Sequence, residues 1–388
     1  MHGSVKRHPT NDLNTRLHYI SELFSAFVKK NAVLCVAASL ALITSFIVPV
    51  DEKYISYFDF KTLSCLFCTL AVIGGLKNLG VFEKTAHAII KKAGTLRTAV
   101  TLLVFITYFG SMLIANDMAL ITFLPLGYYV LTSTGREEYM AFTFIMQNIA
   151  ANLGGMLTPF GNPQNLFLYT RFNIPDMEFM QIMLIPFISA AVLIVLCCFV
   201  VKNEKVELKG DEVSMPDVKK TVLYLILFAF SIAIVFRVIP YVLGLIIIPL
   251  AVLLLDKKVL TEVDYPLLLT FVCFFIFAGN MSRIDVINNV LSLLMEKSTL
   301  LVSVVSCQFI SNVPSAVLLS NFTENYRELL MGVNIGGAGT LIASLASLIT
   351  FKEYVSHDPA GTKRYIGLFS LMNFAFLIIL TLISYFTL

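Results

Sequence analysis

The sequence predicts an all-α integral membrane protein built from two inverted repeats, each with a re-entrant hairpin and an interrupted transmembrane helix. Three observations support this prediction. The chain is 57% hydrophobic and only 14% charged, with a mean hydropathy of +0.83, whereas soluble domains are about half apolar and about a quarter charged. Its apolar runs are roughly 20 residues long, the length that a helix needs to cross a bilayer. Turn-forming residues interrupt these runs at matching places in the two halves.

The apolar runs follow one another along most of the chain. Because lipid cannot form hydrogen bonds with the backbone, we expect each run to be helical. We expect membrane elements at 32–50, 61–79, 98–132, 138–170, 177–201, 219–238, 240–255, 265–281, 298–322, 328–354 and 363–386. These divide the chain into a cytoplasmic N-terminal segment 1–31 with an amphipathic helix over 17–28, a first repeat 32–201, a cytoplasmic linker 202–218, an inverting linker helix 219–239 and a second repeat 240–388.

Two of the segments are predicted to form hairpins that enter and leave the membrane on the same side. Segment 298–322 has apolar arms of roughly 10–13 residues on either side of the sequence SNVPS (311–315), and arms of this length cannot cross a core of about 30 Å. Segment 98–132 has the same form, with ANDMA (115–119) at its tip. Each tip is therefore expected at mid-membrane depth.

The segment 155–167 reads GMLTPFGNPQNLF and places a turn sequence inside an apolar run. Pro159 and Pro163 each remove a backbone donor, which breaks a helix. The amides of Asn162 and Asn165 can satisfy the freed carbonyl groups or bind a ligand. The sequence therefore predicts a break that faces a polar site inside the protein.

The same break is expected in the second half. The sequence NLGG (152–155) recurs as NIGG (334–337), which aligns Thr158 with Thr340 and GNPQN with ASLAS at 343–347. The second copy has no proline but is rich in glycine and serine. Repeats with broken helices are typical of secondary transporters.

The distribution of basic residues predicts the orientation. Of the 28 Lys and Arg residues, 21 fall on the side of the N-terminus and seven on the other. The seven are Lys53, Lys61, Arg171, Arg237, Arg283, Lys297 and Arg327. Because basic residues favour the cytoplasmic side, we expect a cytoplasmic N-terminus and an external C-terminus. We expect the Arg237 side chain to snorkel to the membrane surface.

The tips and breaks carry the candidate substrate site. A helix that ends or begins in the membrane exposes unpaired backbone groups, and Ser, Asn and Asp are the residues that cap such ends. A helix N-terminus also favours an anion. We expect the substrate to lie between the two tips, where it contacts Asn116, Asn162, Pro163, Ser311, Asn312 and Thr340.

The candidate site for a coupling cation centres on Asp117, an acid deep in an apolar segment. A charge at such depth costs at least about 2.5–3.5 kcal/mol on insertion scales, so it usually has a function. We expect Na⁺ or H⁺ to bind at Asn116, Asp117, Gly161, Asn162 and Asn165, with Na⁺ as the candidate metal ion. A second cation site, or a further part of the substrate site, is expected at Ser311, Asn312, Ser344 and Ser347.

Other classes of function find little support. The seven cysteines all lie in apolar segments, and the five histidines form no cluster in the sequence, which disfavours a metal enzyme. An intramembrane aspartyl protease needs two acids at depth, whereas one is found. A channel remains an alternative that concentrative uptake would exclude. We expect no enzymatic activity, no cofactor besides the coupling ion and no nucleic-acid partner.

At these motifs the chain resembles the ion transporter superfamily, which includes divalent-anion/sodium symporters, citrate transporters, arsenite permeases and a group of sodium/proton antiporters. The resemblance covers about 32–386 and is greatest to small bacterial anion or citrate permeases. It implies a homodimer in the bacterial cytoplasmic (inner) membrane, with a scaffold domain and a moving transport domain.

The resemblance also implies roles for the tip residues. In dicarboxylate members each tip reads Ser-Asn-Thr and contacts substrate and sodium. Here the corresponding positions are Ala115, Asn116 and Asp117 in the first tip and Ser311, Asn312 and Val313 in the second. Both asparagines match this tip sequence, whereas the residue at the third position differs from threonine in both tips. Asp117 places a negative charge in the site, as arsenite and sodium/proton members do.

The sequence therefore predicts a cation-coupled secondary transporter that moves a small anion, a carboxylate or an inorganic oxyanion, by alternating access. The cation would neutralise Asp117 and order the first tip. The alternative is a sodium/proton antiporter or an arsenite-type efflux permease in which Asp117 is the exchanging carboxylate. The expected partners are the small anion, membrane lipid and a second copy of the chain.

Overall fold

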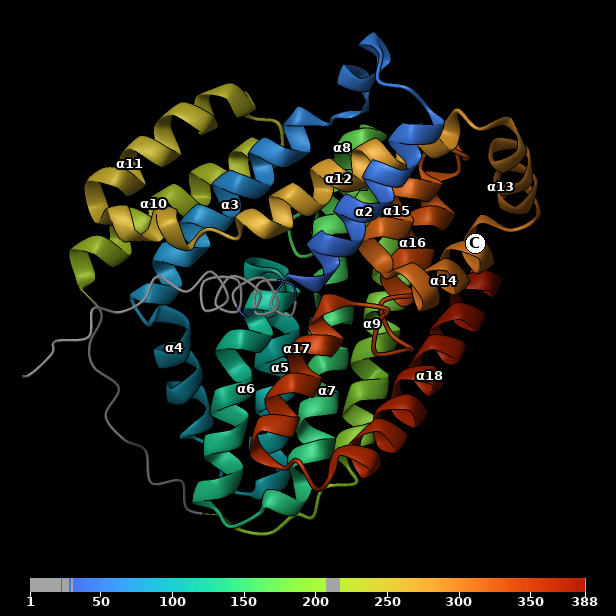
Figure 1. The fold of residues 1–388 in the computed structure, drawn as a ribbon. Helices are drawn as coiled ribbons and strands as arrows, with labels where there is room; N and C mark the ends of the chain where they lie inside the picture. Colours follow the sequence, from blue (N-terminus) through green and yellow to red (C-terminus); the bar gives the residue numbers. More distant parts are fainter. Residues whose placement is uncertain (1–21, 23–27, 29–30, 207–216, 388) are drawn as a thin grey trace, which may run out of the picture.

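The computed structural model describes residues 22, 28, 31–206 and 217–387, and this part of the chain is almost entirely helical (Figure 1). Within it, six helices are long and apolar enough to cross a membrane: α3, α5, α9, α10, α12 and α18. The predicted class of all-α integral membrane protein is confirmed. The amphipathic helix expected over 17–28 and most of the linker 202–218 lie outside the described residues.

The helices of the first half correspond closely to the predicted elements. They are α2 (Ala32–Ile47), the 3₁₀ helix η1 (Glu52–Tyr57), α3 (Phe60–Asn78), α4 (Val81–Ile90), α5 (Leu96–Ile114), α6 (Asn116–Ser133), η2 (Glu137–Tyr139), α7 (Met140–Gly154), η3 (Gly155–Leu157), α8 (Pro163–Arg171) and α9 (Asp176–Cys198).

The second half follows after the linker. Its helices are α10 (Val218–Val235), α11 (Tyr241–Glu262), α12 (Tyr265–Ser282), α13 (Asp285–Lys297), α14 (Thr299–Ile310), α15 (Asn312–Leu319), α16 (Tyr326–Ile335), α17 (Leu345–His357) and α18 (Thr362–Thr387). The predicted end of the segment 240–255 is marked in α11 by a kink at Asp256 (φ −162°, ψ 96°).

The helices pack as two groups. In the first group, which we call the side body, α2 packs on α12, and α3 packs on α10 and α11. In the second, the main bundle, α5, α6 and α7 pack with α17, and α14 packs with α15 and α16. The two groups meet where α12 contacts α15 and α3 contacts α8. Figure 1 shows the side body at the upper left and the main bundle extending to the lower end.

Both predicted tips are breaks with the same backbone conformation. Ala115, between α5 and α6, has φ 65° and ψ 153°, and Ser311, between α14 and α15, has φ 72° and ψ 160°. A residue with a side chain rarely adopts these angles, which cost about 1–3 kcal/mol and occur mainly at ligand sites. With 12 and 8 residues, α14 and α15 are too short to cross a membrane. The 19-residue α5 is long enough to cross one, so the re-entrant path of the first hairpin stays a prediction.

Both predicted helix interruptions are confirmed. In the first half α7 ends at Gly154 and α8 begins at Pro163, and in the second α16 ends at Ile335 and α17 begins at Leu345. Figure 1 shows that α7 and α8 run from the lower end to the upper end, whereas α16 and α17 run the opposite way. This antiparallel arrangement is what an inverted repeat requires, while the repeat as a whole stays a prediction.

Three features differ from the sequence-based expectations. The helices α4 and α13 were not predicted, because with 10 and 13 residues they are too short to cross a membrane and charged or polar residues interrupt their apolar ones. The expectation that Arg237 snorkels to the surface is wrong. Its guanidinium donates to the carbonyl oxygen of Tyr169 (2.7 Å) and lies 4.0 Å from the centre of the Tyr169 ring. Arg237 has φ 64°, which turns the chain after α10 and directs the side chain towards α8.

Candidate functional site at the paired helix breaks

Each hairpin tip is bound to the break of the interrupted helix in its own half. The Asn116 N–H donates to the carbonyl oxygen of Gly161 (3.1 Å), and the Asn312 N–H donates to that of Ala343 (2.9 Å). These are aligned positions in the two halves. The sequence thus brings the tips and the breaks together twice, in the same way.

The two tip asparagines also fix the start of the helix that follows each of them. Asn116 Oδ1 accepts from the Asp117 N–H (2.9 Å), and Asn312 Oδ1 accepts from the Val313 N–H (2.9 Å). Both asparagines are buried. Because the first two N–H groups of α6 and α15 are occupied in this way, these helix starts offer a ligand their positive dipole end and side-chain groups.

The aligned threonines Thr158 and Thr340 anchor the breaks to the hairpin arms. The Thr158 hydroxyl donates to the carbonyl oxygen of Met112 (2.7 Å), and the Thr340 hydroxyl donates to that of Gln308 (3.0 Å). Thr340 was predicted to contact substrate, and the structure gives its hydroxyl this structural partner.

Asn165 holds the first break together. Its Nδ2 lies within hydrogen-bond distance of the carbonyl oxygens of Gly155 (3.1 Å), Met156 (3.2 Å) and Thr158 (3.2 Å). These carbonyl groups lie beyond the end of α7, in η3 and directly after it, and that of Thr158 also accepts from the Gly161 N–H (3.2 Å). Asn165 is fully buried.

Gln308 does the same for the second break, and the sequence analysis did not identify it. Its Nε2 donates towards the carbonyl oxygens of Gly336 (2.9 Å) and Ala338 (3.2 Å), and its Oε1 accepts from the Thr340 N–H (2.9 Å). The available signal was a glutamine inside the short apolar arm α14. Because it comes from the hairpin rather than from the broken helix, alignment of the two halves could not assign its role.

A buried amide network connects the two halves. Asn334 Nδ2 donates to Asn165 Oδ1 (2.6 Å), and Asn334 Oδ1 accepts from Asn162 (3.2 Å) and Gln164 (3.4 Å). Asn334 on α16 thus binds three residues of the first break. It was not predicted as a site residue, although it belongs to the NIGG motif.

The network continues to the first tip and to α17. Asn152, the aligned partner of Asn334, accepts from Asn116 Nδ2 (3.2 Å), and Asn148 on α7 donates to the Ser347 hydroxyl (3.3 Å). Ser344 and Ser347 share a hydrogen bond of 2.9 Å at the start of α17. The Ser311 hydroxyl lies 3.2 Å from the carbonyl oxygen of Ala343.

Three buried oxygen atoms at the first tip and break have no hydrogen-bond partner among the described residues: Asp117 Oδ1, Asn162 Oδ1 and Gln164 Oε1. Asn162 is 1% exposed. Buried polar atoms in native proteins almost always have a partner, so such atoms call for an explanation such as a bound ion. Carboxylate and amide oxygens are suitable ligands for a hard cation.

The first tip lines a small cavity of about 80 Å³ between the side body and the main bundle. Asn116, Asp117 and Pro163 line it, and so does Asp264, which caps α12 by accepting from the Leu267 N–H (3.0 Å). The sequence analysis missed Asp264, because it lies just outside an apolar segment and its position before Tyr265-Pro266 is typical of a helix cap. The cavity therefore holds two carboxylates, one from each group of helices.

The described residues include no group of three or more His, Cys, Asp or Glu side chains that could hold a metal ion. A cation at the first tip would therefore depend on amide and carbonyl oxygens in addition to Asp117. This donor set suits Na⁺ or a proton better than a transition metal, which favours imidazole and thiolate ligands.

Comparison with known proteins gives a consistent result. The sequence model of the citrate transporter family matches residues 20–326. An uncharacterized transporter of Methanocaldococcus jannaschii is 33% identical over 332 residues, which are 84% of this chain and 90% of that protein. The inner membrane protein YbiR of Escherichia coli is 29% identical over 352 residues, 88% of this chain and 91% of that protein.

A silicon efflux transporter of Oryza sativa subsp. japonica is 28% identical over a shorter stretch of 143 residues, 37% of this chain and 29% of that protein. The family and these relatives are transporters or membrane proteins and not enzymes. The resemblance expected from the tip and break motifs is confirmed: this chain belongs to the citrate transporter family.

Proposed function

We propose that this protein is a secondary active transporter that couples the movement of a small anion, a carboxylate or an inorganic oxyanion, to Na⁺ or H⁺ by alternating access. One observation carries the proposal. Asp117 and Asn162 each carry a buried oxygen without a partner among the described residues, and they directly follow Asn116 and Gly161, the two residues whose hydrogen bond joins the first tip to the first break. A cation bound there would contact the hairpin and the broken helix at once.

The anion is proposed to bind between the two tips. Asn116, Asn162, Pro163, Ser311 and Asn312 border the region where the helices α6, α8 and α15 begin. Helix N-termini carry partial positive charge and favour anions. The negative charge of Asp117 opposes this, so the anion would bind well only after a cation has neutralised Asp117.

The division into two groups of helices supports alternating access. Asp117 comes from the main bundle and Asp264 from the side body, and both line the same cavity. A movement of one group against the other would change the distance between these carboxylates. Like charges repel each other, so a cation between them would favour the closed arrangement.

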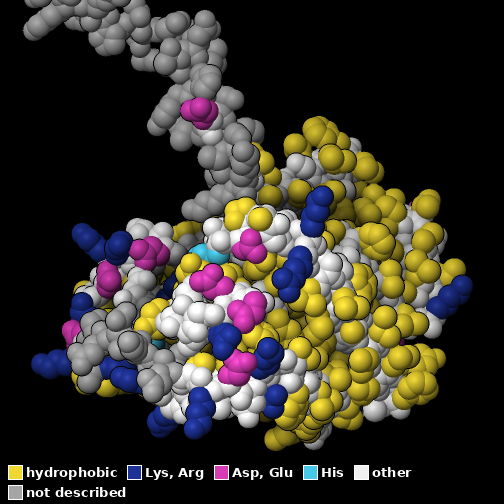
Figure 2. Space-filling view, turned by 90° about the horizontal axis from the view of Figure 1, so that it is seen from below, with side chains coloured by type: hydrophobic (Ala, Val, Ile, Leu, Met, Phe, Trp, Pro, Cys, Tyr) yellow, Lys and Arg dark blue, Asp and Glu magenta, His cyan; other side chains and the backbone are white. Residues whose placement is uncertain are grey.

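The surface supports a location in the bacterial cytoplasmic membrane, with the lower end of the molecule in Figure 1 facing the cytoplasm. Figure 2 shows many Lys and Arg side chains at this lower end, next to a wide hydrophobic surface. Large apolar side chains are exposed along α9, α10, α11 and α18, as contact with lipid requires. We also propose that the two halves are inverted relative to each other and that the protein forms a homodimer.

The second candidate is an exchanger, either a sodium/proton antiporter or an efflux permease for a neutral species such as arsenous acid. The pair of carboxylates in one cavity favours it, because one could release a proton as a cation arrives. The silicon efflux transporter among the relatives supports the same direction of transport. In this case no anion would be needed for cation movement.

Uptake into proteoliposomes tests the proposal. Citrate, succinate, phosphate, sulfate and arsenite would each be offered with an inward Na⁺ gradient, an inward H⁺ gradient or neither. We expect at least one of the anions to accumulate above its outside concentration only when a cation gradient is present. Proton release on adding Na⁺ without any anion would instead support the exchanger. Equilibration of solutes without accumulation under every gradient would contradict both and indicate a channel.

A further inference from the structure

A second and much larger cavity, of about 710 Å³, lies between the two groups of helices near the upper end of the molecule. The side body contributes η1, the start of α3 and the end of α12 to it. The main bundle contributes the ends of α8 and α15. This cavity is separate from the small one at the first tip, which shares none of its lining residues.

Two cationic side chains, Lys61 and Arg171, line this cavity. Neither forms an ion pair with a described residue. Asp59 is the acid among the lining residues, and it is engaged elsewhere: it accepts from the N–H (3.0 Å) and the hydroxyl (2.7 Å) of Thr62 to cap α3. The lining therefore has a net positive charge with two cations free to meet a ligand.

The helix dipole favours the position of one of these two cations but not that of the other. Arg171 is the last residue of α8, where a cation interacts favourably with the negative dipole end. Lys61 is the second residue of α3, where a cation is unfavourable. Arg237 and Asp59 both lie within electrostatic reach of Lys61, the first repelling it and the second attracting it. A bound anion would compensate for the remaining positive charge of Lys61 and Arg171.

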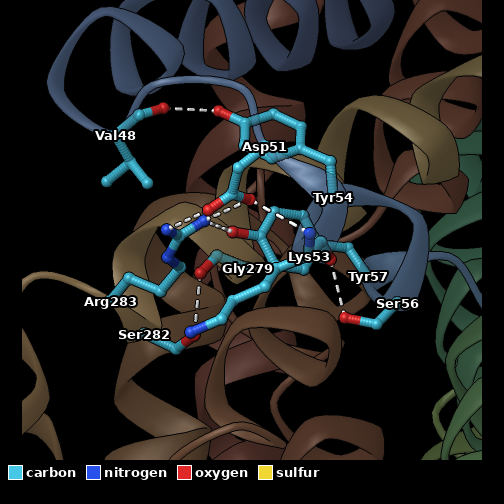
Figure 3. Close-up of polar contacts among 9 residues, drawn as sticks. All are labelled: Val48, Asp51, Lys53, Tyr54, Ser56, Tyr57, Gly279, Ser282 and Arg283. Atoms are coloured by element: carbon cyan, nitrogen blue, oxygen red, sulfur yellow. Dashed lines mark hydrogen bonds and ion pairs between the residues drawn. The ribbon is translucent and has the colours of Figure 1, made fainter.

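The side-body wall of the cavity is fixed by contacts among its own residues (Figure 3). A Cβ at Gly279 would lie 2.4 Å from the Tyr57 ring, so the ring packs directly on the backbone of α12. Arg283 donates to the Tyr57 hydroxyl (2.9 Å) and forms a bidentate pair with Asp51 (2.6 and 3.0 Å). The hydrogen bonds from Arg283 hold the pKa of the Asp51 carboxyl below its usual value.

The polar hydroxyls of the same wall are satisfied locally. Ser56 Oγ donates to the carbonyl oxygen of Lys53 (2.6 Å), and Ser282 Oγ donates to that of Gly279 (2.8 Å), as Figure 3 shows. Both hydroxyls are thus occupied by backbone carbonyl groups. Lys61 and Arg171 remain as the charged groups with which an anion could pair.

The cavity lies at the far ends of the two helices that begin at the candidate site. Of α8, which begins at Pro163, Thr170 and Arg171 reach the cavity, and of the segment that begins at Asn312, Ser320 and Asn321 do so. Nine residues of α8 span about 13 Å at about 1.5 Å per residue. The length of one short helix therefore separates the cavity from the breaks.

We propose that this cavity is an anion-recruiting vestibule in which Lys61 and Arg171 bind the carboxylate or oxyanion groups of a solute before it reaches the helix tips. This inference rests on the proposed function of anion transport. Lys61 and Arg171 would then determine the selectivity for anions at the upper end of the protein.

The test uses a cysteine introduced into the cavity wall as a reporter of local charge. Ser56→Cys is placed in the cavity, and Asn289→Cys on α13 is the matched control, exposed and outside the cavity. The purified full chain in lipid nanodiscs would be treated with an anionic and a cationic methanethiosulfonate of similar size. The unsubstituted chain gives the background from the native cysteines.

We expect the ratio of anionic to cationic reaction rates to be about tenfold higher at Ser56→Cys than at Asn289→Cys, because a charged cleft raises the local concentration of its counter-ion by about 10- to 1000-fold. Adding Lys61→Gln and Arg171→Gln should bring the two ratios together. Lys61→Arg and Arg171→Lys, which keep the charge, should preserve the difference. Citrate should slow the reaction at Ser56→Cys relative to chloride of equal ionic strength, but not after the Gln substitutions.

Equal ratios at the two cysteines, or a difference that survives the Gln substitutions, would overturn the vestibule. Citrate protection that is unchanged by the Gln substitutions would also overturn it. These results are independent of the transport assay. Anion uptake with equal ratios would reject the vestibule alone, whereas the charge-dependent ratio without uptake of any anion would reject the proposed function alone.

Discussion

Asp117→Asn is expected to reduce cation-dependent anion uptake by roughly 10- to 100-fold. The substitution keeps the size of the side chain but removes its negative charge from a buried oxygen that has no partner among the described residues. An interaction with a charged group contributes about 1.5–3 kcal/mol, and each 1.4 kcal/mol corresponds to about tenfold in affinity. The cation would lose this contribution. Initial rates of uptake into proteoliposomes at several cation concentrations measure the effect.

Asp264→Asn is the matched control for this prediction. It removes the other carboxylate of the same cavity, and asparagine is as good a helix cap as aspartate, so α12 should keep its start. Asp264 is exposed, unlike Asp117 Oδ1, and solvent should weaken its effect on a cation. We expect a smaller reduction than for Asp117→Asn. Uptake by Asp117→Asn with normal rate and normal cation dependence would contradict the role assigned to Asp117.

Asn165→Leu is expected to give the largest loss of stability of any single substitution in the site. Leucine has a similar volume but leaves the carbonyl groups of Gly155, Met156 and Thr158 without their shared donor. The Asn334 amide loses one of its two acceptors but keeps the carbonyl oxygen of Leu330, and the Thr158 carbonyl keeps the Gly161 N–H as a donor. Each buried group left without a partner costs about 1–3 kcal/mol, so we expect a loss of at least about 1–3 kcal/mol. The midpoint of thermal unfolding in detergent measures it.

Asn373→Leu on α18 is the control for this substitution. Asn373 is fully buried, like Asn165, but its Nδ2 donates only to the carbonyl oxygen of Phe369, one turn earlier in the same helix. Its Oδ1 has no partner among the described residues. Replacing such a group by an apolar one should be nearly neutral or stabilising. If Asn165→Leu and Asn373→Leu shifted the unfolding midpoint by the same amount, the amide would not be what holds the break.

The sequence was sufficient to locate the long apolar helices, both tips and both breaks. Pro159 and Pro163 each remove a backbone donor, so a local rule identified the first break. The second break lacks proline, and only its alignment with the first identified it. The helices α4 and α13 were missed because they are too short to cross a membrane and charged or polar residues interrupt their apolar ones.

The contacts that complete the site could not be predicted in the same way. Asn334 and Gln308 bind groups far away in the sequence, and nothing in their local context indicates which carbonyl or amide they reach. Asp264 enters the site because the side body packs against the first tip. Arg237 was predicted to reach the surface from its place near a helix end, but its positive φ directs it towards Tyr169. In each case tertiary packing determines the partner.

The coupling of cation and anion binding is the central claim, and calorimetry on the purified protein tests it most directly. The anion that uptake identifies would be titrated in Na⁺, in an inert organic cation and over a range of pH. We predict that the coupling cation raises the affinity for the anion at least about tenfold, that the anion raises the affinity for the cation by the same factor, and that Asp117→Asn abolishes both effects. Equal anion affinity with and without Na⁺ at every pH would contradict the claim.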